Sequence, residues 1–131
     1  MIGYITIGVN DVKKAVDFYC NLLEDLGVKV IADRGRLVAL GHSMQEPLLS
    51  VCIPSNGEPA TPGNGNMFAI PLASKEQIDL VYNKAVALGA SCEGTPGERA
   101  SGSYGAYVRD PDGNKMAFYW FSPQMLEQPG H

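Results

Sequence analysis

Histidine and cysteine are scarce in this chain of 131 residues, which has two histidines and three cysteines. The cysteines, Cys20, Cys52 and Cys92, are odd in number and have no C-x-x-C spacing. This usage is typical of a reducing compartment and not of a disulfide scaffold. We therefore predict a cytoplasmic protein in which all three cysteines are small core residues.

Long apolar runs and basic clusters are also missing. No run approaches the roughly 20 apolar residues that span a bilayer, and the first residues lack the basic and then apolar stretches of a secretory signal. With 10 basic and 14 acidic residues the net charge is −4, which argues against a nucleic-acid surface. We expect neither a membrane nor a nucleic acid as a partner.

The apolar residues recur in two halves that have the same order of patterns. In the first half Asn10 and Asp11 can cap a helix with apolar residues at helical spacing, and Gly27 is its stop signal. In the second half Ser74 and Gln77 form a capping box at the start of another helix. The strand candidates are residues 2–9, 28–32, 36–40 and 48–53, then 67–72, 90–93, 104–109 and 115–121. Each half is therefore predicted to be a β-α-β-β-β module.

The two modules predict an α+β fold in one domain, residues 1–131. Their bounds are about 1–54 and 66–122, with a linker at 55–65 that is rich in proline and glycine. A sheet with one helix on it leaves a concave face, and two modules can close these faces into a shared cup. A ferredoxin-like α+β sandwich is the alternative.

A tight turn, residues 110–113, connects the last two strand candidates. Pro111 fixes φ at the second turn position, Asp110 can accept backbone N–H bonds, and Gly113 tolerates positive φ. We predict a structural role, and no catalytic one, for Asp110 and Asp112.

Several stretches together resemble one known family. They are residues 2–11, 15–19 and 59–63 and the segment 106–115 that contains the turn. In this order and spacing they resemble the vicinal oxygen chelate superfamily (glyoxalase, bleomycin-resistance and extradiol dioxygenase proteins). The likeness covers residues 2 to about 121 and implies two βαβββ modules that form a shared cup-like half-barrel.

The resemblance implies a metal centre whose ligands this chain lacks. Relatives bind a divalent ion through two histidines and a glutamate, which leaves positions open for a bidentate substrate. The matching positions are Tyr4, Met67 and Ala117, so we predict no metal and no other cofactor. His42 and Glu46 offer too few ligands for a replacement site, and we expect His42 to be a solvated loop residue.

The cup wall predicted from strand alternation is apolar and aromatic, with a few hydroxyl groups. Relatives often present a ligand-contacting tyrosine where Tyr107 stands, and use the glycine-rich loop 94–103 as a lid with a positioning arginine, here Arg99. The candidate ligand-binding residues are Tyr4, Ser50, Met67, Arg99, Tyr107, Ala117, Tyr119 and Phe121. The same side chains can instead fill the cup and leave no cavity.

Three functions follow from this wall. The first is metal-independent binding of a small aromatic or apolar molecule, by a protein that pairs as a homodimer as relatives of this length commonly do. The second is a lyase or dioxygenase-like enzyme with an altered active site, in which a tyrosine serves as the acid. Since the unperturbed pKa of tyrosine is about 10, it is a poor base at neutral pH. The third is an interaction or structural subunit with a filled cup. Whether the chain is an enzyme stays open at this point.

Overall fold

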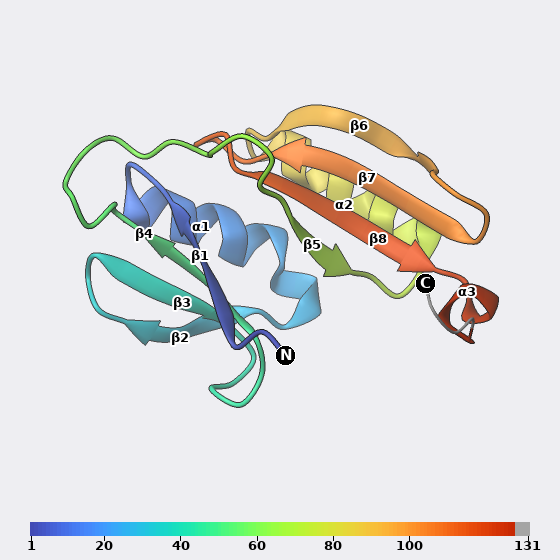
Figure 1. The fold of residues 1–131 in the computed structure, drawn as a ribbon, viewed down its shortest axis with the longest axis horizontal. Coiled ribbons are helices and arrows are strands. Elements are labelled where there is room, and N and C mark those ends of the chain that lie inside the picture. The colour runs from blue at the N-terminus through green and yellow to red at the C-terminus, as the bar shows by residue number, and fades with distance from the viewer. Residues whose placement is uncertain (128–131) are drawn as a thin grey trace. The chain divides into compact units, whose positions relative to one another are not determined.

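The computed structural model describes residues 1–127 and divides the chain into two compact units. The first unit contains Met1–Asn64 together with Pro111–Asn114, and the second contains Gly65–Asp110 together with the residues from Lys115 onward. Each unit has a four-stranded mixed sheet with one long helix, in the order β-α-β-β-β (Figure 1). Among the described residues, no helix has the length and apolar content of a membrane span.

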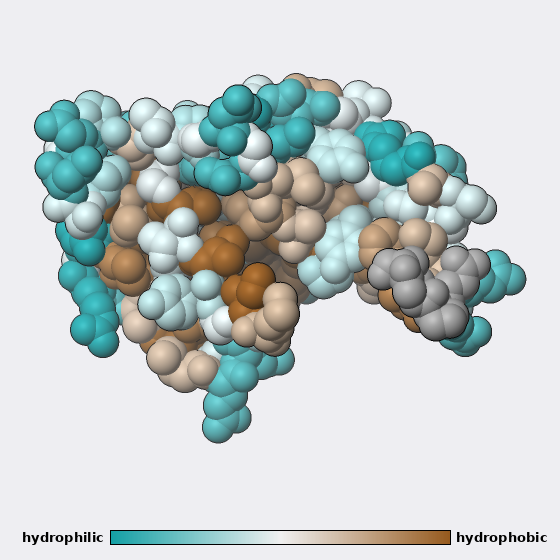
Figure 2. All heavy atoms as spheres, viewed as in Figure 1, coloured by the Kyte–Doolittle hydropathy of each residue, from teal (hydrophilic) through white to brown (hydrophobic). Residues whose placement is uncertain are grey.

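The first unit has strand order β1-β4-β3-β2, in which β1 and β4 are parallel and the other pairs antiparallel. Its elements are β1 (Tyr4–Gly8), α1 (Val12–Leu22), the short 3-10 helix η1 (Glu24–Leu26), β2 (Lys29–Asp33), β3 (Leu37–Gly41) and β4 (Leu48–Cys52). Asp11 caps α1, because its Oδ1 accepts the backbone N–H of Lys14 at 3.0 Å. The buried face of α1, which includes Tyr19 and Leu22, belongs to the core of this unit. Apolar side chains also gather along β1 at the surface (Figure 2).

The second unit repeats this topology with strand order β5-β8-β7-β6, and β5 is parallel to β8. Its elements are β5 (Phe68–Pro71), α2 (Lys75–Ala87), β6 (Ser91–Glu98), β7 (Ser103–Arg109), β8 (Lys115–Phe121) and a short helix α3 (Pro123–Glu127). Helix α2 packs along one face of this sheet (Figure 1) and buries Ile78, Val81 and Ala85. On the strands, Val108, Met116 and Phe118 are fully buried.

The α+β class and the two βαβββ modules are confirmed, and the ferredoxin-like alternative is wrong because the strands form two sheets instead of one. Both helix caps are also confirmed, with one change in the second. Ser74 Oγ accepts the N–H of Gln77 at 3.1 Å, whereas Gln77 Oε1 accepts the N–H of Ala73 at 2.7 Å instead of that of Ser74. The Gln77 side chain therefore bonds to the backbone N–H one residue before the one that the capping box predicts.

Three local expectations are wrong. Strand β6 continues to Glu98, into the segment expected as a loop, because two register shifts near Gly94 let its glycines stay paired with β7. Helix α1 ends at Leu22, before Gly27, which instead ends η1 with a φ of 77°. Cys92 is exposed, since it lies on the edge strand β6, and Cys20 and Cys52 are only half-buried.

The turn at 110–113 has a structural role within the first unit. Asp112 Oδ1 accepts the backbone N–H of Asn10 at 3.0 Å, and Asn114 Nδ2 donates to the carbonyl of Gly8 at 2.9 Å. The side-chain oxygen of Asn10 also accepts the N–H of Ala60 at 2.8 Å. The turn and the linker are thus held to the end of β1 by side-chain hydrogen bonds, as a structural role for Asp112 requires.

We expect Gly113→Ala to lower the free energy of unfolding by about 1–2 kcal/mol, because a side chain at positive φ is strained. Gly113 has a φ of 91°, and a Cβ there would also contact Pro62 at 3.4 Å. Gly3→Ala is the matched control, since Gly3 has no positive φ and a Cβ there would meet nothing within 4 Å. Urea unfolding measures both variants, and an equal loss in the two would contradict the argument.

Candidate functional site

A cavity of about 340 Å³ opens on the face of the second sheet that α2 does not cover. This volume is within the range of ligand-binding pockets. Its wall is mostly apolar and comes mainly from β7 and β8. The residues that line it are Met67, Ala69, Arg99, Ser103, Tyr104, Gly105, Tyr107, Ala117, Phe118, Tyr119 and Phe121.

Strand register explains the hollow. Ala117 is paired with Ala69 of β5 on one side and with Tyr107 of β7 on the other, so the middle of the sheet carries two methyl groups. Gly105 is paired with Tyr119, which leaves room beside that ring. Small residues thus stand between aromatic ones on the same face, and the sheet itself forms the floor of the cavity.

Arg99 lies directly after β6 and its side chain lies over glycines. A Cβ built on Gly94 or Gly97 would come within 3.3 Å of the Arg99 guanidinium nitrogens. The guanidinium lies 5.2 Å from the centre of the Tyr107 ring, a cation–π distance, and donates a hydrogen bond to the carbonyl of Thr95. The positive charge of Arg99 is therefore fixed at the wall of the cavity.

Six of the eight predicted ligand-binding residues line this cavity: Met67, Arg99, Tyr107, Ala117, Tyr119 and Phe121. The other two, Tyr4 and Ser50, belong to the first unit, on the paired strands β1 and β4. Tyr4 is exposed, whereas Ser50 is 2% exposed. Their part in a ligand site stays a prediction.

Five lining residues are not in the candidate list: Ala69, which strand alternation places on this face, and Ser103, Tyr104, Gly105 and Phe118, which sequence reasoning missed. Alternation along β7 carried a usable signal, because Gly105 and Ser103 share the face of Tyr107. Tyr104 and Phe118 alternate to the α2 side, so no period-2 pattern would have selected them.

Tyr104 is bonded on the α2 side of the sheet. Its hydroxyl donates to Asp79 Oδ1 of α2 at 2.8 Å, and this hydrogen bond raises the pKa of Tyr104 above its ordinary value. Lys75 lies 5.6 Å from the centre of the same ring and pairs with Glu98 at 2.9 Å. The hydroxyl is neutral at physiological pH and is already used by Asp79, which makes it unsuitable as a base.

The family's metal-binding positions do not fit a divalent ion. Ala117 presents only a methyl group to the cavity, and Met67 presents a thioether, which is a poor ligand for hard cations. Throughout residues 1–127, no three His, Cys, Asp or Glu side chains gather as a possible metal site. The donor set of this cavity suits an organic molecule better than a metal ion.

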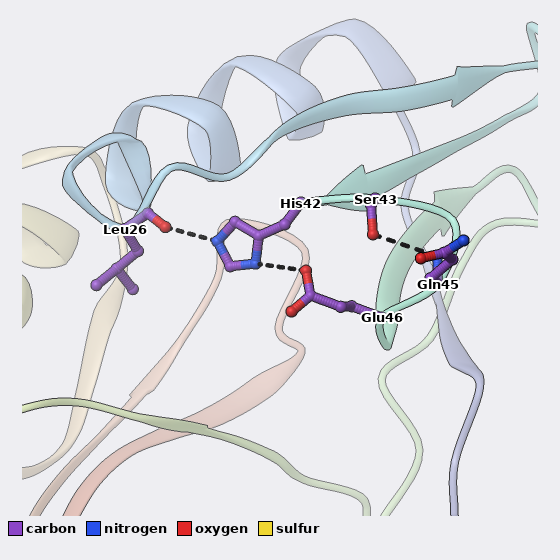
Figure 3. Close-up of polar contacts among 5 residues, drawn as sticks. All are labelled: Leu26, His42, Ser43, Gln45 and Glu46. Atoms are coloured by element: carbon purple, nitrogen blue, oxygen red, sulfur yellow. Dashed lines mark hydrogen bonds and ion pairs between the residues drawn. The ribbon is translucent and has the colours of Figure 1, made fainter.

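His42 is an exposed loop residue, as expected, and its ring also has a hydrogen-bond partner. Its Nε2 lies 2.6 Å from the carbonyl of Leu26, and its Nδ1 lies 3.7 Å from Glu46 Oε2 (Figure 3). Gly27, the next residue after Leu26, lies beside this ring, since a Cβ built on it would be 3.5 Å from His42 Cδ2. The exposed histidine thus links the β3–β4 loop to the end of η1, a structural contact in the first unit.

Comparisons with known proteins agree on the family of this fold. A sequence model of the Glyoxalase/Bleomycin resistance protein/Dioxygenase superfamily matches residues 1–118. A glyoxalase/bleomycin resistance protein from Albidiferax ferrireducens has 34% sequence identity and a TM-score of 0.82, over 92% of this chain and 98% of that one. A comparison with curated protein sequences gave no match.

More distant structures share the fold. A glyoxalase/bleomycin resistance protein/dioxygenase family enzyme from Burkholderia phytofirmans is 20% identical, with a TM-score of 0.77 over 91% of this chain and 97% of that one. A lactoylglutathione lyase from Agrobacterium tumefaciens is 23% identical, with a TM-score of 0.66 over 92% of each chain.

Proposed function

Because the chain belongs to the glyoxalase/bleomycin resistance protein/dioxygenase superfamily, we propose that it binds a small aromatic or apolar molecule without a metal ion. The binding site is the cavity on the open face of the second sheet. The observation that carries this proposal is the wall itself, in which Tyr107, Tyr119 and Phe121 line the same cavity as the methyl group of Ala117.

The aromatic side chains supply large apolar contact surfaces, and they lose little conformational freedom when a ligand binds. Tyr119 and Phe121 already contact each other, with ring centres 4.9 Å apart, so their positions are fixed before a ligand arrives. Both rings are half-buried, which leaves part of each surface for a ligand. Such a wall favours flat, apolar molecules.

In this chain the cavity binds an organic molecule at the place where relatives bind a metal ion. At Ala117, where relatives place a carboxylate, this chain has a methyl group that is 4% exposed and forms part of the floor. A carboxylate there would be desolvated by an apolar ligand, whereas a methyl group contacts it favourably. The change that removes a metal ligand also enlarges the cavity.

N-Phenyl-1-naphthylamine, a neutral dye that fluoresces in apolar surroundings, tests this function. Protein treated with EDTA and then dialysed should bind the dye saturably, with about one site per chain and an affinity in the micromolar range. Added Zn²⁺, Mn²⁺ or Ni²⁺ should leave the affinity unchanged. An absence of saturable binding would refute the proposal, and so would binding that is lost with EDTA and restored by a divalent ion.

A further inference from the structure

We propose that the molecule bound in this cavity carries an anionic group, and that Arg99 and Lys115 bind this group beside Tyr107. The inference rests on the proposed function, since it specifies the chemistry of the ligand at the same site. It is carried by the positions and the pairing of the charged side chains on this face of the sheet.

The backbone of the second sheet is shaped to carry Arg99. Gly94, Gly97 and Gly105 lie under its side chain, at 3.3 Å from Nη2, 3.3 Å from Nη1 and 3.9 Å from Cγ, measured from a Cβ built on each glycine. A Cβ at Gly94 or Gly97 would crowd the guanidinium, whereas one at Gly105 would be in ordinary van der Waals contact with the arginine. Because these positions are glycines, the Arg99 side chain can lie against the sheet and reach the cavity.

Lys115 brings a second positive charge to the same tyrosine. It begins β8 and alternates with Ala117 and Tyr119, so it lies on the cavity face of the sheet. Its Nζ is 5.5 Å from the centre of the Tyr107 ring, and the guanidinium of Arg99 is 5.2 Å from that centre. One aromatic ring is thus in cation–π contact with two cations.

Neither cation is paired with a carboxylate of the described residues. In residues 1–127 the acidic side chain on this face, Glu93, is paired with Arg109, and Arg99 and Lys115 form no ion pair. The only hydrogen bond that the Arg99 side chain makes within the described chain is to the carbonyl of Thr95. A guanidinium has five N–H donors, so most of them remain for a ligand.

The local charge opposes that of the whole chain. The net charge of the sequence is −4, yet Arg99, Arg109 and Lys115 outnumber Glu93 on this face of the sheet. An anion beside Tyr107 is attracted by both cations. A carboxylate, sulfonate or phosphonate is also the group that an arginine fork binds with two parallel hydrogen bonds.

The expected ligand therefore combines an apolar or aromatic body with one anionic group. The body occupies the cavity over Ala117 and lies against the contacting rings of Tyr119 and Phe121. The anion lies at the Tyr107 side of the cavity, near Arg99 and Lys115. A neutral molecule of the same shape would leave the two cations uncompensated.

A matched pair of dyes tests the inference. 1-Anilinonaphthalene-8-sulfonate has the carbon skeleton of N-phenyl-1-naphthylamine and adds a sulfonate. The native protein should bind the sulfonate at least about ten-fold more tightly than the neutral dye. Raising the salt concentration from about 0.05 M to about 0.5 M should reduce this difference, because salt screens exposed charges.

Two variants test whether Arg99 and Lys115 cause the preference for the sulfonate dye. Arg99→Gln and Lys115→Met should each lower the ratio of sulfonate affinity to neutral-dye affinity by about ten-fold. Arg34→Gln, an exposed site in the first unit, is the control for the change in net charge and should alter neither affinity. Thermal midpoints within about 2 °C of the native protein exclude unfolding as the cause.

Each other result has a defined meaning. If both dyes bind the native protein equally, or if both variants weaken the two dyes alike, the inference is wrong and the proposed function stands. If neither dye binds, the proposed function and the inference fall together. A carboxylate probe, 1-naphthoate against 1-naphthaldehyde as competitors, should show the same preference and extends the result from sulfonates to carboxylates.

Discussion

Ala117→Leu is expected to abolish binding of N-phenyl-1-naphthylamine while the protein stays folded. Ala117 lies in the middle of β8 between Ala69 and Tyr107, and its methyl group is part of the cavity floor. The larger side chain extends toward the cavity and away from the side that packs on α2, so the fold should tolerate it. The ligand loses the space it needs, and we expect its affinity to fall by at least about 100-fold.

Ala87→Leu is the matched control for this variant. It makes the same substitution at an exposed position near the end of α2, outside the cavity. Fluorescence titration gives the affinity of each variant, and a thermal melt verifies the fold. Binding by Ala117→Leu at the native affinity would show that the dye occupies another place, and the proposed site would then be wrong.

Phe118→Ala is expected to reduce the free energy of unfolding by about 3–5 kcal/mol, the cost of removing a buried phenylalanine side chain. Phe118 is 0% exposed and follows Ala117 on β8, with its side chain toward α2. Since domains of this size have only about 5–15 kcal/mol of stability, this one change should bring the protein close to unfolding at physiological temperature.

Leu80→Ala is the control for the loss of Phe118. Leu80 also lies in the second unit, on α2, but it is 71% exposed. Its replacement should change the stability by less than about 0.5 kcal/mol. Urea unfolding curves provide both values. Similar losses in the two variants would mean that the α2 side of this sheet is not the core of the unit.

Adjacent residues on β8 therefore have opposite roles. Ala117 and Phe118 differ by one position, yet one faces the cavity and the other faces the helix. Period-2 alternation predicts this division from the sequence alone, because a strand with a helix on one face must send its large apolar residues to that side. The same rule places Tyr119 and Phe121 on the cavity side.

Arg99 shows the limit of such reasoning. The segment from 94 to 103 has no regular period, so only the resemblance to relatives indicates that its arginine faces a ligand. The structure extends β6 to Glu98 through irregular pairing, and the glycines of that pairing leave the space that Arg99 occupies. A register shift depends on the partner strand, and neighbouring residues in the sequence do not encode it alone.

The contact between the turn at 110–113 and Asn10 also depends on residues that are far apart in the sequence. Pro111 and Gly113 fix a tight turn by their own conformational preferences, which the sequence shows directly. The partner of Asp112 is Asn10, far away in the sequence and identified only by a hydrogen bond. Likewise, the sequence predicts a solvated His42, because nothing near it in the chain identifies the carbonyl of Leu26 as its partner.

The sequence by itself determined the element order, both helix caps, the alternation of faces on β8 and the absence of the family's metal ligands at Tyr4, Met67 and Ala117. These properties depend on residue identity and on local periodicity. Only the tertiary structure decided that a cavity remains over Ala117, and that two cations with no carboxylate partner among residues 1–127 lie beside Tyr107. The physical reason is that volume and charge pairing are set by residues far apart in the chain, through strand register. That Tyr4 and Ser50 join the same site stays a prediction.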